Sequence, residues 1–302
     1  MTAKTPRRIG PIIGQSLDDR MSAHVVSNVY RRSGTEATER EHPELIVERA
    51  GNILSVDAVG GAKLIYGYEN SRAFIDLFPE MFEELLPRIR SSLGAETVRF
   101  RLTHSPARPV VEPVLKRLWF TPTRDWLGFT LAKGVKLPAA TVGGVRFRNA
   151  VEADLADLVR IDDEAFPKTP IGVDDMRDRL RNKRVEVLVA TAGKGIAGFH
   201  LIEKPEEGVG WISVLAVAAD ERGRGIGRAL TIRAAKRLFA LGASDAGLST
   251  DEESAPAIRL YVNLGFRQDR AGRDYSRPTD PRRIEQMRVE GEGTLIRFGG
   301  WR

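Results

Sequence analysis

The feature that most constrains this chain is a glycine-arginine segment at residues 222–228, which lies between an apolar run and a helical pattern. Glycine occupies every second position (Gly223, Gly225 and Gly227), and arginines lie before, between and after the glycines (Arg222, Arg224 and Arg228). Apolar residues then recur at helical spacing through residue 241. The order of these patterns predicts a strand, a loop with little side-chain bulk, and a helix.

A loop of this kind before a helix is suited to bind an anion. The first turn of a helix leaves about four backbone N–H groups without internal partners, and the helix dipole adds partial positive charge. Glycine leaves room for a phosphate and adopts positive φ at little cost. Two common phosphate motifs do not fit, because the segment ends Gly-Arg-Ala and Arg228 replaces the third glycine of a dinucleotide loop. The alternative is a glycine-rich turn with solvated arginines.

Three linked elements resemble the GNAT family of acetyltransferases. Residues 222–227, RGRGIG, are similar to the family's R/Q-x-x-G-x-G/A element, and residues 214–217, VLAV, resemble its fourth strand. Residues 254–266, SAPAIRLYVNLGF, resemble its N-x-x-A-x-x-L-Y-x-x-x-G-F element. The elements occur in the family's order, and the resemblance covers about residues 145–266. The C-terminal half is therefore identified as a GNAT domain.

The resemblance implies a site for acetyl-CoA in a V-shaped gap where the fourth and fifth strands separate. The backbone of Leu215 and Val217 would pair with the pantetheine arm, and the N–H groups of residues 223–228 would hold the pyrophosphate. Ser254 stands where the family has asparagine, and its shorter side chain would donate one hydrogen bond. The implied cofactor-binding residues are Leu215, Val217, Arg222, Gly223, Arg224, Gly225, Ile226, Gly227, Arg228 and Ser254.

The resemblance also implies catalytic roles. Tyr261 matches the position from which family members protonate the departing CoA thiolate, and a backbone N–H near residues 215–217 would stabilise the oxyanion. Trp211 stands near the place of the family's strand-four glutamate and cannot act as a base. Glu203 is our candidate base, with His200, Glu164 or a water chain as alternatives. A packing role for Tyr261 and a solvated strand end for Glu203 are the structural alternatives.

The two halves have a similar element order, and together with this the resemblance implies an α+β fold with two GNAT-like domains, each a mixed, mostly antiparallel sheet flanked by helices, with the splayed strand pair in the C-terminal one. We expect a degenerate GNAT-like domain at residues 1–134, a linker at 135–144, and a catalytic GNAT domain with a C-terminal tail at 145–302. Residues 114–131, VLKRLWFTPTRDWLGFTL, resemble the family's closing helix and strand. The N-terminal half has no counterpart of the glycine-arginine segment, so we expect it not to hold the cofactor.

Local patterns in the N-terminal half and the tail give further expectations. Gly60 and Gly61 predict a hairpin turn between two strands. Residues 71–94 have helical spacing, but Pro79 and Pro87 predict two short helices or a kinked one. The sequence ends in a strand-like segment at residues 293–300, and residues 1–42 are expected to include one helix.

Composition limits the chemistry and the partners. The chain has no cysteine, which excludes disulfides, thiolate metal sites and a cysteine acyl-enzyme and favours a cytoplasmic protein. Its four histidines lack metal-ligand spacing, so we expect no metal. No apolar run is long enough to span a membrane. The net charge of +6 comes from scattered basic pairs, which argues against nucleic acid and suits a small polyanionic ligand.

These observations predict an N-acetyltransferase that transfers an acetyl group from acetyl-CoA to a primary amine by direct attack in a ternary complex. The favoured acceptor is a small molecule, and a protein lysine or N-terminus is the alternative acceptor. A non-catalytic acyl-CoA-binding regulatory module is a second class of function, and a nucleic-acid binder is a third. The sequence leaves a homodimer open.

Overall fold

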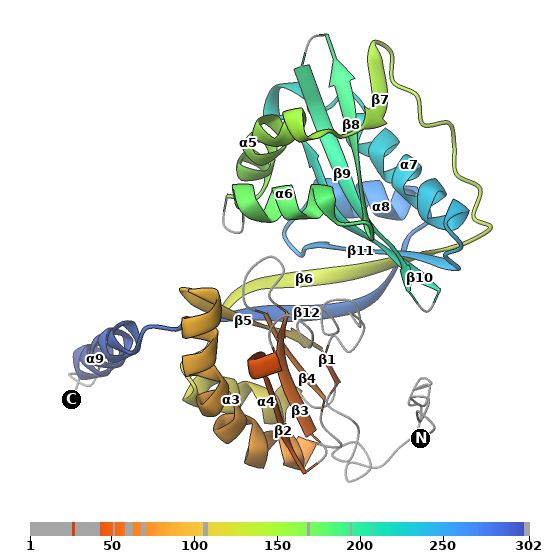
Figure 1. The fold of residues 1–302 in the computed structure, drawn as a ribbon. Helices are drawn as coiled ribbons and strands as arrows, with labels where there is room; N and C mark the ends of the chain where they lie inside the picture. Colours follow the sequence, from red (N-terminus) through yellow and green to blue (C-terminus); the bar gives the residue numbers. More distant parts are fainter. Residues whose placement is uncertain are drawn as a thin grey trace. The chain divides into compact units, whose positions relative to one another are not determined.

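The computed structural model describes residues 26–27, 43–50, 52–57, 63–67, 71–104, 108–167, 170–193, 195–206 and 208–298. The chain forms two compact units, Met1–Pro122 with Tyr275–Arg302 and Thr123–Asp274 (Figure 1). These boundaries differ from those expected from the sequence. Strand β6 (Thr121–Ala132) pairs with β11 (Asp245–Asp251) from Trp126 to Ala132 and so belongs largely to the second unit. Tyr275 packs in the core of the first unit, so the C-terminal tail that begins there belongs to that unit.

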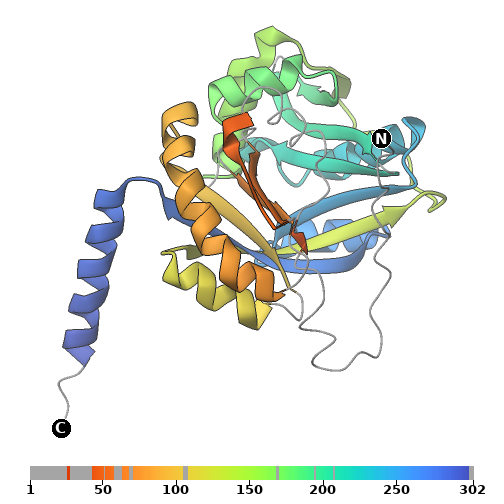
Figure 2. The same ribbon diagram turned by 60° about the horizontal axis from the view of Figure 1, so that its bottom comes forward.

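The first unit is a mixed sheet with two helices. Its strands are β1 (Val26–Ser27), β2 (Ile46–Arg49), β3 (Asn52–Asp57), β4 (Lys63–Gly67) and β5 (Thr97–Thr103), with a 3-10 turn, η1 (Pro43–Leu45), before β2. β4 and β5 are parallel, whereas β3 is antiparallel to both β2 and β4. The helices α3 (Ser71–Leu93) and α4 (Arg108–Arg117) lie side by side along the sheet (Figure 2).

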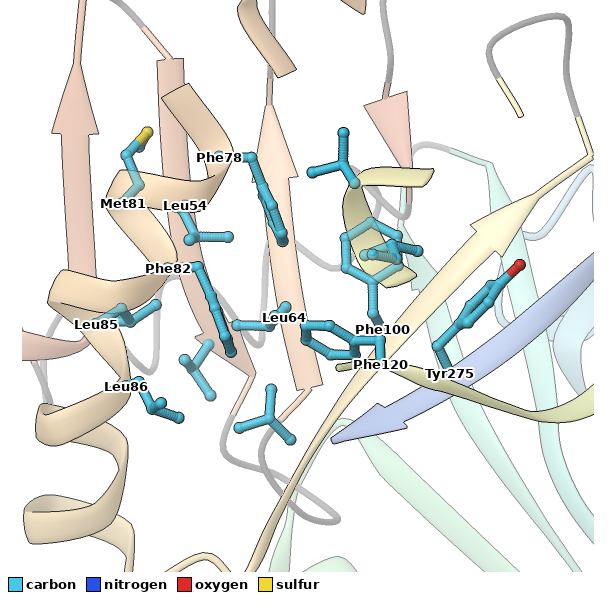
Figure 3. Packing of buried hydrophobic residues seen from close by; sticks show 14 of the residues in the cluster. Leu54, Leu64, Phe78, Met81, Phe82, Leu85, Leu86, Phe100, Phe120 and Tyr275 are labelled. Atoms are coloured by element: carbon cyan, nitrogen blue, oxygen red, sulfur yellow. The ribbon is translucent and has the colours of Figure 1, made fainter. Parts of the chain in front are cut away.

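Helix α3 is continuous, so the expected division into two short helices at Pro79 and Pro87 is wrong. Its aromatic side chains follow one another at four-residue spacing and point to the sheet, where they meet Phe100 and Phe120 (Figure 3). The rings of Phe74 and Phe78 stack at 4.5 Å between centroids. Burial of this whole apolar face stabilises the helix by more than the two prolines destabilise it. The expected turn at Gly60 and Gly61 and most of the expected N-terminal helix lie outside the described residues.

The second unit has the strand order β12-β6-β11-β10-β9-β8-β7. The new strands are β7 (Val145–Asn149), β8 (Val185–Ala192), β9 (Gly195–Glu206), β10 (Val209–Val217) and β12 (Arg267–Pro278). The helical segments are η2 (Glu152–Asp154), α5 (Leu155–Ala165), α6 (Val173–Arg181), η3 (Ala219–Glu221), α7 (Ile226–Ala240) and α8 (Ala255–Asn263). Helices α5 and α6 pack on one face of this sheet, and α7 and α8 pack on the other. The α+β class with a mostly antiparallel mixed sheet is confirmed.

The C-terminal tail differs from its expected structure. Residues 293–300 were expected to form a strand, but Pro281–Phe298 form helix α9. Asp280 supports the first turn, because its Oδ1 accepts the N–H of Arg282 at 2.9 Å. Arg288 and Glu285 form an ion pair one turn apart. The prediction of a strand was therefore wrong, because it did not take into account the helix-stabilising residues that precede residues 293–300 by about ten positions.

Asp162 is a buried carboxylate that ties α5 to the segment before α6. Its side chain is fully buried, and its Oδ2 accepts the N–H of Ile171 at 2.6 Å. Its Oδ1 is also buried and has no hydrogen-bond partner. Burial raises the pKa of Asp162 to about 6. The charged form therefore costs stability, and this cost grows as pH rises from about 4 to about 6.

Replacement of Asp162 should stabilise the protein in a pH-dependent way. Asp162→Asn keeps an oxygen for the Ile171 N–H and removes the buried charge. We expect the free energy of unfolding to increase by about 1–3 kcal/mol at pH 7.5 and to change little at pH 4. Urea unfolding at the two pH values measures the difference. An equal effect at both pH values would show that the charge is not the cause.

Candidate functional site

Strands β10 and β11 pair over a short stretch and then separate. Their parallel register runs from Val209 opposite Asp245 to Ile212 opposite Leu248. Beyond this point β11 continues along β6 as far as Asp251. β10 continues along β9, but its register shifts between Ile212 and Val214, which leaves Ser213 as an extra residue. The two strands thus form a fork that opens after Ile212.

The edge of β10 that faces the fork presents backbone groups. The N–H of Ala218 donates to the carbonyl of Ala197 in β9 at 3.0 Å. Backbone groups alternate between the two edges of a strand, so the N–H groups of Leu215 and Val217 are directed to the opposite edge. In agreement, the carbonyl of Val217 accepts the Nε–H of Arg222 at 3.2 Å. This places Leu215 and Val217, the two predicted pairing positions, on the open edge.

The glycine-arginine loop ends at the fork. Gly223 and Gly225 have φ of 79° and 82°, so the expected positive φ is confirmed at both. A Cβ atom at either glycine would have no atom within 4 Å, which shows that the loop surface is open. Gly225 is the N-cap of α7, and no side chain caps this end. The first helical bond runs from the N–H of Ala229 to the carbonyl of Gly225 at 3.0 Å.

The N–H groups of Ile226, Gly227 and Arg228 therefore precede the hydrogen-bond ladder of α7. Gly227 also links the helix to the fork, because a Cβ there would lie 3.6 Å from Cγ2 of Val217 and 3.8 Å from Cδ2 of Leu215. The first turn contains no acidic residue. The helix terminus and the open strand edge thus adjoin one another.

The three arginines of the loop are exposed but not equivalent. Arg224 forms an ion pair with Glu221, which offsets its charge. Arg222 is directed to the carbonyl of Val217 at the strand edge. Arg228 lies in the first turn of α7 and is exposed. Positive charge near the uncapped N–H groups therefore comes mainly from Arg222, Arg228 and the helix dipole.

Tyr261 and Ser254 lie on α8. The ring of Tyr261 packs between Phe129 and Phe266, each at 5.9 Å between centroids. Burial raises the pKa of Tyr261 to about 12, so its hydroxyl keeps its proton at neutral pH. Ser254 is the N-cap of α8, but its hydroxyl makes no capping bond. Tyr261 thus packs in the core, and its hydroxyl is protonated at neutral pH.

Glu203 lies in β9 directly opposite Trp211 of β10. Its Oε1 accepts a short hydrogen bond from the hydroxyl of Ser213, the extra residue at the fork. The structure therefore brings Glu203 to the point where β10 leaves β11. Sequence reasoning missed Ser213, because no local pattern marks a bulge that arises from pairing between two strands.

The two other candidate bases lie in different surroundings. His200 is 2% exposed, and its Nδ1 lies 3.0 Å from the carbonyl of Leu230 in α7. Burial lowers the pKa of His200 to about 4, which leaves the ring neutral at pH 7. Glu164 lies on α5 and pairs with Arg160 at 2.9 Å. Among these three candidates, Glu203 contacts the fork through its side chain, which accepts a hydrogen bond from Ser213. His200 pairs with Leu215 through its backbone, and its ring is directed to α7.

The first unit also contains a parallel strand pair that separates, but there another strand of the chain pairs with the edge that becomes free. β4 and β5 pair in parallel only at Lys63 with Arg99 and at Leu64 with Phe100. Tyr66 and Gly67, further along β4, pair instead with β1. β3 pairs with the full length of β4 on its other edge, so β1 occupies the edge that β5 leaves. The connection from β4 to α3 has the sequence Tyr-Glu-Asn and contains no glycine.

Other sites were sought in the part of the chain that the structure describes. There, no group of three or more histidine or carboxylate side chains could hold a metal ion. Within the same residues, no helix has both the length and the apolar character needed to cross a membrane.

Comparisons with known proteins match the second unit to a family. Residues 154–266 match the model of the Acetyltransferase (GNAT) family. A mycothiol acetyltransferase of Actinosynnema mirum is 29% identical over 127 residues, which cover 39% of this chain and 43% of that protein. A mycothiol acetyltransferase of Saccharopolyspora erythraea is 26% identical over 261 residues, which cover 79% of this chain and 81% of that protein. The match thus spans less than half of the first relative and about four fifths of the second.

A solved structure supports the two-unit arrangement. A tandem GNAT protein from the clavulanic acid biosynthesis pathway superposes with a TM-score of 0.61 at 11% identity, covering 88% of this chain and 94% of that chain. At this identity the likeness concerns the fold, and it extends over both units. Residues 154–266, which contain the fork and the glycine-arginine loop, therefore match the GNAT acetyltransferase family, and the fold of both units resembles that of a tandem GNAT protein.

Proposed function

We propose that the second unit is an acetyl-CoA-dependent N-acetyltransferase that acts on a primary amine by direct attack. One observation carries the proposal: the open edge of β10 at Leu215 and Val217 adjoins the uncapped N-terminus of α7 through Gly227. An extended amide chain can add to a strand edge, and a pyrophosphate can bind a helix N-terminus. The pantetheine arm and pyrophosphate of acetyl-CoA combine these two groups.

The proposed binding mode assigns roles to the predicted residues. Leu215 and Val217 pair with the two amides of the pantetheine arm. The N–H groups of residues 223–228 hold the pyrophosphate, with charge from Arg222 and Arg228. The Ser254 hydroxyl, which makes no capping bond, is free to contact the cofactor.

In the proposed reaction, the amine nitrogen attacks the thioester carbonyl carbon and forms a tetrahedral oxyanion. A backbone N–H of β10 near residues 215–217 stabilises the oxyanion. The C–S bond then breaks, and the thiolate takes the proton of the Tyr261 hydroxyl. Glu203, held by Ser213 at the fork, accepts the proton that the amine nitrogen loses. The products are an amide and CoA, and solvent returns the two residues to their starting protonation states.

We further propose that each chain holds one acetyl-CoA. In the first unit β1 pairs with the part of β4 that β5 leaves. The connection after β4 also lacks glycines for a phosphate. Both features support a degenerate N-terminal copy that lacks a cofactor site.

The favoured acceptor is a small-molecule amine. The relatives named mycothiol acetyltransferase support this class of acceptor. A protein lysine or N-terminus is the alternative acceptor. A non-catalytic acyl-CoA-binding module remains the other alternative, because Trp211 and Ser254 depart from the family pattern. The absence of cysteine suits a cytoplasmic enzyme.

The loop assignment is tested with two substitutions at one position. Gly225 has positive φ, so both Gly225→Ala and Gly225→Glu strain the backbone by about 1–2 kcal/mol. Only glutamate adds bulk and negative charge where the pyrophosphate would bind. We expect Gly225→Glu to weaken acetyl-CoA binding at least about tenfold more than Gly225→Ala, measured by calorimetry. Equal affinities of the two variants would remove the pyrophosphate from this loop.

The acid role is tested with Tyr261→Phe. This variant keeps the ring that packs against Phe129 and Phe266 and removes only the hydroxyl. We expect kcat to fall about 100-fold or more, with unchanged acetyl-CoA affinity. CoA release measures the rate, and calorimetry measures the affinity. An unchanged kcat would assign Tyr261 to packing alone.

A further inference from the structure

A row of four residues crosses the sheet one position before the fork opens. Glu203 in β9 lies opposite Trp211 in β10, Trp211 lies opposite Gly247 in β11, and Gly247 lies opposite Thr130 in β6. Residues directly opposite one another project to the same face of a sheet. The neighbouring row of Ile202, Ile212, Leu248 and Phe129 packs in the core with α7 and α8. The row of Glu203 and Trp211 therefore faces away from those helices.

Trp211 lies across Gly247 on this face. A Cβ atom at Gly247 would lie only 3.0 Å from Cζ3 and 3.1 Å from Cε3 of the indole. No side chain fits at position 247 unless the indole moves. The glycine therefore allows the Trp211 ring to extend over β11, beside the place where β10 and β11 separate.

Arg270 of β12 completes this arrangement. Its guanidinium carbon lies 4.7 Å from the centroid of the Trp211 ring. Its Nη2 donates to the hydroxyl of Thr130 at 3.2 Å, and its Nε donates to Oδ1 of Asp269 at 3.1 Å. Oδ2 of Asp269 in turn accepts the Thr130 hydroxyl at 2.7 Å. We call Trp211 and Arg270, with their supports Thr130 and Asp269, the Trp-Arg wall.

The Trp-Arg wall holds the planar guanidinium of Arg270 in one orientation, and part of the Arg270 side chain remains exposed to solvent. The Arg270 side chain is 35% exposed, and the structure shows no partner for its Nη1 among the described residues. Ser249, which follows Gly247 on the same face of β11, is also exposed. Asp269 offsets the positive charge of Arg270. The guanidinium N–H groups of Arg270 would therefore recognise a ligand mainly through oriented hydrogen bonds, and less through net charge. Such preorganised donors match a carboxylate or a phosphate.

We propose that the Trp-Arg wall selects the acceptor, and that the acceptor is a primary amine that also carries a carboxylate or phosphate group. The anion accepts hydrogen bonds from Arg270, and the amine points to the fork, where Glu203 and Ser213 lie. The wall and the fork are one to two strand spacings apart, so about 5–10 Å separates the amine from the anion. This inference rests on the proposed acetyl transfer and adds the chemical class of its acceptor.

The test uses pairs of amines that differ only in the anion. The pairs are β-alanine with β-alaninamide, O-phosphoethanolamine with ethanolamine, and glucosamine 6-phosphate with glucosamine. CoA release gives kcat/KM for each amine, and calorimetry gives the affinity for acetyl-CoA. We expect the full-length protein to prefer at least one anionic member over its neutral partner by about tenfold or more.

Arg270→Gln assigns that preference to the wall. It should lower kcat/KM for the preferred anionic amine by about 10- to 100-fold, mainly through KM, with the neutral partner and acetyl-CoA affinity changed less than about twofold. Arg270→Lys should restore part of the loss, because it keeps the charge but not the planar donor pair. Arg267→Gln is the matched control, because Arg267 is an exposed arginine of the same strand outside the wall. It should leave all of these values unchanged.

The outcomes separate this inference from the proposed function. Three results would overturn the anionic acceptor and leave the cofactor site standing. The protein could prefer the neutral members, Arg270→Gln could lower kcat/KM equally for both members of a pair, or a protein that binds acetyl-CoA could turn over none of the six amines. Failure to bind acetyl-CoA would instead overturn the proposed function, and the acceptor class with it.

Discussion

The loss of a hydrogen-bonding partner along one edge of β10 is the constraint on which the site depends. From Ser213 onward β10 keeps β9 on one side, but β11 has turned away to follow β6. Backbone N–H and C=O groups need partners, and here Arg222 supplies one to the carbonyl of Val217. The bulge at Ser213 sets where the fork begins and brings the Ser213 hydroxyl to Glu203. α7 starts beside the same edge, so the uncapped N-terminus of this helix and the open strand edge adjoin.

The two units meet the same constraint in different ways. Each contains a parallel strand pair that separates after a few residues, β4 with β5 and β10 with β11. In the first unit a segment of the chain itself, β1, pairs with the strand edge that becomes free. In the second unit the corresponding edge stays open next to a glycine loop, which suits a ligand that pairs like a strand. The two units therefore differ in whether the strand edge that becomes free is paired within the chain, at β1 in the first unit, or stays open, as in the second.

Local signals predicted much of the fold and of the loop. The alternating glycines of residues 223–227 correctly indicated positive φ at Gly223 and Gly225 and a helix that follows the loop, whereas Gly227 lies inside α7 and has no positive φ. Signals that depend on distant residues were missed or misread. Pro79 and Pro87 do not break α3, because its aromatic face is buried against the sheet. The contact of Trp211 with Gly247 and Arg270 joins three strands that are far apart in the sequence, so no local pattern could show that Trp211 helps to form a wall.

We expect one open fork per chain to bind acetyl-CoA. A calorimetric titration of the full-length protein with acetyl-CoA gives affinity and stoichiometry together. Binding should occur with a dissociation constant in about the micromolar range and at one site per chain. Two sites per chain would contradict the closure of the first unit by β1. The absence of binding would contradict the assignment of the fork and the glycine-arginine loop to the cofactor.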